Sequence, residues 1–135
     1  MFKKIMVAID GSETSLEALK EARNIAAFYH GTLRIVYAVA DSADADQQAG
    51  LEMLEHAKST VVNGVEVETR VLHAEAEYGL NGIAEAVADA ANEWGADLLA
   101  MGTANRRGLE RLVIGSVAEQ MVGKVDASIL LVRPR

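Results

Sequence analysis

Residues 3–22 read KKIMVAIDGSETSLEALKEA, and the pattern of apolar residues changes from that of a strand to that of a helix within this stretch. After its two lysines, the run up to residue 9 is continuously apolar, which is typical of a strand buried on both faces. Asp10, Gly11 and Ser12 form a turn signal, and Ser12 can cap a following helix. Apolar residues then recur every three or four positions, at Leu16, Leu19, Ala22 and Ala26. The stretch predicts a buried strand followed by an amphipathic helix.

Four further segments have the composition of strands. They cover residues 32–40, 65–73, 96–102 and 127–132. Apolar and polar residues alternate over 65–73, which indicates a strand with one less covered face near a sheet edge. The last segment, ASILLV, is apolar, and we expect it at an edge as well.

Helical patterns separate the predicted strands. Glycine marks their ends, at Gly31, at Asn63-Gly64 and at Gly95, and the last helix is predicted to begin at Ser116. The acidic, alanine-rich segment 41–50 has little apolar content, so we expect a mobile loop there. The second helix then begins near residue 51, and its apolar stripe is formed by Leu51, Leu54, Ala57 or Lys58, and Val61.

The predicted order is β-α-β-α-β-α-β-α-β within a single domain, residues 1–135. Strands that alternate with helices imply right-handed crossovers, and hence an α/β fold with a five-stranded, mainly parallel sheet and helices on both faces. In such sheets, ligands bind beyond the carboxyl ends of the strands, where the strand order reverses. Asp10, residues 39–41, and Met101-Gly102 fall at predicted carboxyl ends, so they are the first candidates for a site.

The charge of the chain limits its partners. A net charge of -7 argues against nucleic acid or an anionic membrane, because both require clustered positive charge. Positive charge is nevertheless concentrated near the C-terminus: residues 101–135 carry six basic and three acidic side chains, whereas the rest carries seven and seventeen. A small polyanion could be attracted there. The first apolar run stops at Asp10, too early for a signal peptide or a membrane span, so we expect a cytoplasmic protein.

The chain offers little for metal or thiol chemistry. It has no cysteine, and its histidines, His30, His56 and His73, show no spacing typical of metal ligands. A metal site and a catalytic thiol are therefore not expected.

The segment 101–121, MGTANRRGLERLVIGSVAEQM, joins the fourth predicted strand to the last helix. Gly102 would let a ligand approach the backbone closely, and Gly115-Ser116 would present free amide groups at a helix N-terminus, which favours an anion. The alternative is an ordinary turn followed by a helix start, because glycines are common at both ends of such loops. The pattern is neither a P-loop nor a G-x-G-x-x-G fingerprint.

Three separated motifs, KKIMVAIDGSETSLEALKEA, GADLLAMGT and RRGLERLVIGSVAEQMV with the final ASILLVRPR, resemble the universal stress protein family over nearly the whole chain. The resemblance implies a Rossmann-like, adenine nucleotide alpha hydrolase-like fold. Family members that bind ATP carry G-x-x-G-x9-G-[ST]. Gly102, Gly115 and Ser116 fit this pattern, but Asn105 replaces the second glycine. Asparagine tolerates the left-handed backbone region, so we expect weakened rather than lost binding.

The resemblance also implies where ATP, with or without Mg²⁺, would lie. Residues beside the adenosine would be Ala8, Ile9 and Asp10, with the backbone of Val39 facing the adenine. Met101 and Gly102 would line the ribose and phosphate side. The triphosphate would be surrounded by Asn105, Gly115, Ser116 and Val117. Asp10 also has an alternative role, because aspartate before Gly-Ser is common in turns and caps.

The function that follows is an ATP-binding stress-response or regulatory module. We expect little or no catalysis, since no evident general base or water-positioning glutamine lies near the loop. A second hypothesis is a nucleotide-free, dimeric interaction protein with a diverged loop, which Asn105 favours. A third, a receiver-like phosphoacceptor, lacks the paired acids and the lysine that such a site requires. In the family the last strand commonly pairs two subunits, so we expect a homodimer through the C-terminal strand.

Overall fold

β1 (Lys4–Ala8) is the central strand of a five-stranded sheet in the computed structural model, which describes residues 1–39, 44–61, 64–75, 79–103 and 120–133. The order is β3-β2-β1-β4-β5, and all four pairings are parallel. The other strands are β2 (Thr32–Val39), β3 (Glu66–His73), β4 (Leu98–Gly102) and β5 (Ser128–Val132). β3 and β5 are the edge strands, as predicted.

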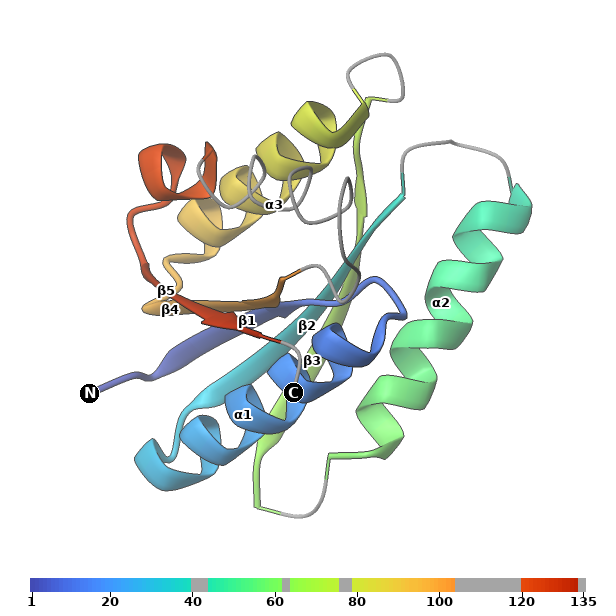
Figure 1. Cartoon of the computed structure of the whole chain (residues 1–135). Helices are drawn as coiled ribbons and strands as arrows, with labels where there is room; N and C mark the ends of the chain where they lie inside the picture. The colour runs from blue at the N-terminus through green and yellow to red at the C-terminus, as the bar shows by residue number, and fades with distance from the viewer. Residues whose placement is uncertain (40–43, 62–63, 76–78, 104–119, 134–135) are drawn as a thin grey trace.

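Helices cover both faces of the sheet, as predicted (Figure 1). On one face α1 (Glu13–Tyr29) and α2 (Asp44–Ser59) pack over odd-numbered β1 residues such as Ile5 and Val7. On the other face α3 (Gly79–Trp94) and Met121, from the helical residues 120–124, pack over Met6 and Val36. The start of this last helix, predicted at Ser116, lies outside the described residues.

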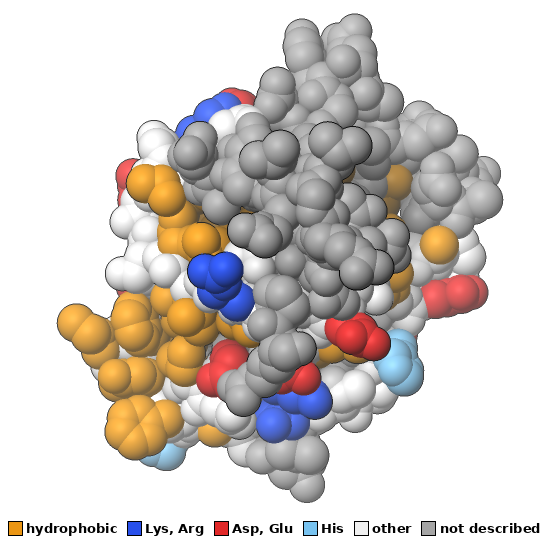
Figure 2. Space-filling view, in the orientation of Figure 1, with side chains coloured by type: hydrophobic (Ala, Val, Ile, Leu, Met, Phe, Trp, Pro, Cys, Tyr) orange, Lys and Arg blue, Asp and Glu red, His pale blue; other side chains and the backbone are white. Residues whose placement is uncertain are grey.

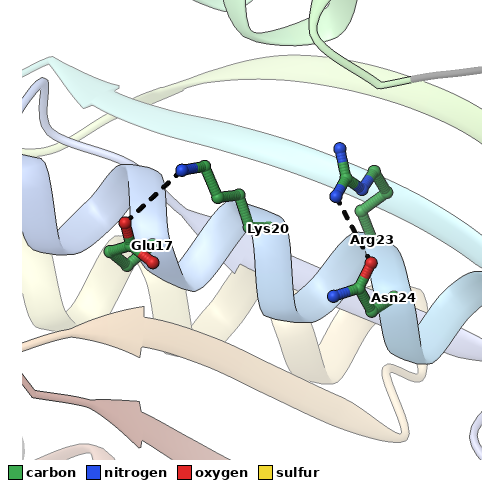
Figure 3. A network of polar contacts seen from close by, with 4 residues as sticks. All are labelled: Glu17, Lys20, Arg23 and Asn24. Carbon is green, nitrogen blue, oxygen red and sulfur yellow. Dashed lines mark hydrogen bonds and ion pairs between the residues drawn. The ribbon is translucent and has the colours of Figure 1, made fainter.

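The first turn of α1 forms as the sequence predicts. Ser12 is the N-cap, and its hydroxyl oxygen accepts a hydrogen bond from Ser15 N at 3.2 Å. The buried stripe includes Leu19, Ala22 and Ala26, but the prediction for Leu16 was wrong, because 41% of this residue is exposed. The outward face is polar, with contacts between Glu17 and Lys20 and between Arg23 and Asn24 (Figure 3).

The end of α1 differs from the prediction by one residue. His30, not Gly31, adopts the left-handed conformation, with φ 57°, and forms the C-cap. A glycine is required at 31 for a different reason: a Cβ there would lie 2.8 Å from the Lys3 carbonyl oxygen and 2.9 Å from that of Phe2. Because Gly31 has no side chain, the start of β2 can lie close to the backbone of Phe2 and Lys3, just before β1.

The prediction of a loop over 41–50 was wrong from residue 44 onward, because α2 begins at Asp44. Alanine and glutamine are good helix formers, and acidic residues are favourable near a helix N-terminus. Gly50 is buried, and a Cβ there would lie 3.0 Å from the Tyr37 ring. Leu54 is buried as predicted, and of the alternatives Ala57 and Lys58 it is Ala57 that is buried, whereas Leu51 is 50% exposed. The backbone of α2 at Gly50 thus packs directly onto β2, and this contact compensates for the low apolar content of the segment 41–50.

Polar contacts hold the amino ends of β1 and β4 together. The Asp97 carboxylate accepts hydrogen bonds from Lys3 N and Lys4 N, both at 2.9 Å. The bonds from the Lys4 and Lys3 amides lower the pKa of the Asp97 carboxyl.

Nearby, the Arg34 guanidinium lies 4.3 Å from the centre of the Trp94 ring and pairs with Glu68 at 2.8 Å. Trp94 is the last residue of α3 and packs, partly buried, against the core cluster on that face of the sheet.

The packing at Gly31 leads to a stability prediction. Gly31→Ala should lower the free energy of unfolding by about 1–3 kcal/mol, because the added methyl group meets backbone oxygens that have little room to move. Urea denaturation would measure this. Gly123→Ala is the matched control, since a Cβ at 123 meets nothing within 4 Å and the residue is helical, so it should be neutral or slightly stabilising. Equal midpoints for Gly31→Ala and the wild type would refute the packing argument.

Candidate functional site

The carboxyl end of β1 is the point where the strand order reverses. β2 and β3 lie on one side of β1, and β4 and β5 lie on the other. The connections that leave β1 and β4 therefore diverge and leave room between them. A cavity of about 250 Å³ opens there. Its lining includes five of the predicted site residues: Ala8, Ile9, Asp10, Met101 and Gly102.

The rest of the described lining was missed in the sequence. α3 contributes Ile83, Ala84 and Val87, and Met121 adds a further apolar side chain. In the sequence these residues belong to helical core patterns, and no signal separates them from ordinary packing residues. Their position gives the cavity an apolar wall on the α3 face, whereas Asp10 and Ser15 supply polar groups at the β1–α1 turn. The cavity suits a ligand with one apolar part and one polar part.

Val39 is not among the residues that line the cavity, whereas its neighbour Ala38 is. Its carbonyl accepts a hydrogen bond from Ala74 N at 2.9 Å, and the residue still pairs with His73 of β3. Pairing of β2 with β1 ends earlier, at Val36, whose carbonyl accepts from Ile9 N. Successive strand residues direct their backbone groups to opposite sides, so Ala38 is the residue that faces the end of β1. Ala38 lines the cavity, as does Tyr37.

Asp10 takes the turn role that the sequence left open. Its Oδ1 accepts a hydrogen bond from Ser12 N at 2.9 Å, and its own amide donates to Ser15 Oγ at 3.3 Å. Ser15 is 2% exposed, and its hydroxyl donates to the Ser12 carbonyl at 2.9 Å. These bonds fix Asp10 at the mouth of the cavity, where the residue is exposed.

Gly102 lies against the start of α1. A Cβ at this position would lie 2.6 Å from the Thr14 carbonyl carbon and 2.8 Å from Ser15 N, both backbone atoms. The described structure therefore gives a packing reason for this glycine, in addition to the ligand access that the sequence predicts. Contact between Gly102 and a ligand stays a prediction. Asn105, Gly115, Ser116 and Val117, predicted around a triphosphate, lie outside the described residues.

A larger hollow, of about 370 Å³, lies between the end of β3 and α3. Its walls carry His73 and three carboxylates, those of Glu75, Glu85 and Asp89. This charge would repel phosphate, and within the described ranges no group of three His, Asp or Glu residues could hold a metal ion. We therefore place the candidate site in the smaller cavity, at the end of β1.

Taken with the fold, this cavity places the protein among the doubly wound parallel α/β proteins, a class whose ligands bind at the strand switch point. The chain belongs to the universal stress protein family, whose model, described as "Universal stress protein family", matches residues 1–133. A universal stress protein of Methanocaldococcus jannaschii is 30% identical, in an alignment that covers 98% of this chain and 83% of the relative.

Solved structures have the same fold. One, a universal stress protein in complex with cAMP, has a TM-score of 0.77 and 22% identity, with 97% of each chain covered. Another, the universal stress protein from Archaeoglobus fulgidus in complex with dAMP, has a TM-score of 0.74 and 21% identity, with 97% of this chain and 98% of that one covered. These likenesses confirm the predicted α/β architecture.

The packing of Gly102 is testable without any ligand. Gly102→Ala should lower the free energy of unfolding by about 1–3 kcal/mol, because the added methyl group would force α1 away from β4. Urea denaturation of the ligand-free protein measures the change, with Gly123→Ala again as the control. A variant as stable as the wild type would mean that α1 can yield at this point, and the packing explanation would fail.

Proposed function

We propose that this protein binds an adenine nucleotide in the cavity at the end of β1 and acts as a cytoplasmic stress-response or regulatory module. One observation carries the proposal: residues predicted separately at the ends of β1 and β4 line one cavity at the switch point of the sheet. Solved family structures of the same fold, in complex with cAMP and with dAMP, support the choice of an adenine nucleotide. The overall negative charge gives no support to a nucleic-acid role.

The lining suggests how the ligand would be oriented. The base would pack against the apolar wall from α3, with its polar edge toward the backbone of Ala38 rather than Val39. The ribose would lie near Asp10. The phosphates would extend past Met101 and Gly102 toward Asn105, Gly115, Ser116 and Val117. ATP, with or without Mg²⁺, is the proposed ligand, since this segment is the basic part of the chain.

We propose binding with little turnover. Asp10 is the single carboxylate in the described lining, and its Oδ1 is already engaged by Ser12 N. A general base must be within reach of the proton it removes, and a bound Mg²⁺ without such a base would give slow hydrolysis at most.

Calorimetric titration with ATP, ADP and AMP, with and without Mg²⁺, tests the proposal. We expect a dissociation constant below the millimolar range for at least one of them. Asn105→Gly should tighten ATP binding, because in the left-handed backbone region an asparagine costs about 1 kcal/mol that a glycine does not. Dissociation constants above the millimolar range for every nucleotide, in both proteins, would favour the nucleotide-free interaction protein instead.

We further propose a homodimer through β5. Figure 2 shows hydrophobic side chains gathered on the side of the molecule where β5 lies. β5 is an edge strand, Leu131 within it is 38% exposed, and Val122 in the preceding helix is 69% exposed. An apolar edge with unpaired backbone groups favours pairing with a second strand.

Light scattering at micromolar concentration should give twice the 14.4 kDa mass of one chain. Leu131→Lys should shift the mass toward the monomer, because a charge on an edge strand opposes pairing. Leu51→Lys, at an exposed leucine of α2, is the control and should leave the mass unchanged. A monomeric wild type would rule out the dimer under these conditions.

A further inference from the structure

Thr14 is a buried polar residue of α1 whose side chain reaches the end of β4. Its hydroxyl donates to the Thr103 carbonyl at 2.6 Å, across 89 positions in sequence, and only 3% of the residue is exposed. The Thr103 amide donates to the Val132 carbonyl at 2.8 Å. The main chain at Thr103 is therefore held by β5 through its amide and by α1 through its carbonyl.

The hydrogen bond between the Ser12 and Thr14 hydroxyl groups can have only one direction. Thr14 Oγ1 lies 3.3 Å from Ser12 Oγ. A threonine hydroxyl has one proton, and that of Thr14 is given to Thr103, so Ser12 must donate to Thr14. Ser12 Oγ in turn accepts from Ser15 N, and Ser12 N donates to Asp10. Short polar side chains thus connect Asp10, at one wall of the cavity, to Thr103, next to Gly102 at the other.

Capping of α1 does not explain this hydroxyl. Ser12 already caps the helix, and Thr14 donates to a carbonyl outside the helix. A valine would have almost the same shape, and burying a hydroxyl is unfavourable unless the group forms a hydrogen bond. The Thr14 hydroxyl is satisfied by its bond to the Thr103 carbonyl, and this bond fixes the residue that follows Gly102. Gly102 itself packs against the backbone of Thr14.

We propose that Thr14 is a positioning residue of the candidate site: its hydroxyl fixes the main chain where β4 leaves the sheet, and so sets the phosphate end of the cavity. The inference rests on the proposed function. It assigns Thr14 to the phosphate end alone, because the apolar end is built from α3 and Ala38. Its effect should therefore depend on whether the ligand carries a phosphate.

The test compares Thr14→Val with the wild type, using AMP and adenosine as paired ligands in calorimetry. Loss of one buried hydrogen bond should weaken AMP binding about fivefold. Adenosine binding should change less than about twofold, since adenosine makes no contact at the phosphate end. In the ligand-free protein, hydrogen exchange at the Thr103 amide, followed by NMR, should become faster in Thr14→Val.

Two further variants serve as controls. Thr14→Ser keeps the hydroxyl and should restore both the AMP affinity and the slow exchange at Thr103. Thr60→Val removes a similar bond, from the Thr60 hydroxyl to the Ala57 carbonyl at 2.7 Å at the end of α2, and should leave both readouts unchanged. If Thr14→Val does not fold, Thr14→Ala, which removes the hydroxyl together with the methyl group, replaces it.

Equal losses for AMP and adenosine, or none for either, would overturn the positioning role, and so would a failure of Thr14→Ser to restore AMP affinity. A wild-type protein that binds neither AMP nor ATP contradicts the proposed function instead. In that case faster exchange at Thr103 in Thr14→Val would still assign Thr14 to holding the end of β4, and unchanged exchange would overturn that as well.

Discussion

Burial of β1 on both faces is the constraint on which the rest of the molecule depends. Ile5, Met6 and Val7 are all fully buried, and the strand pairs with β2 on one side and β4 on the other. A strand in this position needs helices on both faces and strands on both edges. The chain therefore adds β2 and β3 on one side of β1 and then β4 and β5 on the other. This change of side leaves the cavity at the carboxyl end of β1.

The same constraint brings α1 and β4 into close contact. α1 starts directly after β1 and lies on its neighbour β4 so closely that residue 102 has no room for a side chain. A glycine that belongs to a nucleotide-binding pattern in the sequence therefore has a packing role in this structure. The backbone contact that excludes a Cβ at residue 102 lies beside the hydrogen bond from the Thr14 hydroxyl to the Thr103 carbonyl.

The sequence predicted the elements better than their boundaries and inward faces. Alternation of strand and helix, both edge strands and the Ser12 cap are confirmed, because each depends on local pattern. The start of α2 was missed because Gly50 packs through its backbone on Tyr37, which no apolar pattern can show. The sequence pattern pointed to Val39, whereas Ala38 lines the cavity, because the pattern does not fix where β2 stops pairing with β1.

By itself, the sequence determined the parallel α/β fold, its family and the strand ends at which a ligand site should lie. Periodicity, turn residues and motifs are properties of consecutive residues, so they can be read along the chain. Only the tertiary structure decided which residues share the cavity, that α3 supplies its apolar wall, and that Thr14 is bonded to Thr103. These facts depend on segments far apart in sequence, which come together only once both faces of β1 are covered.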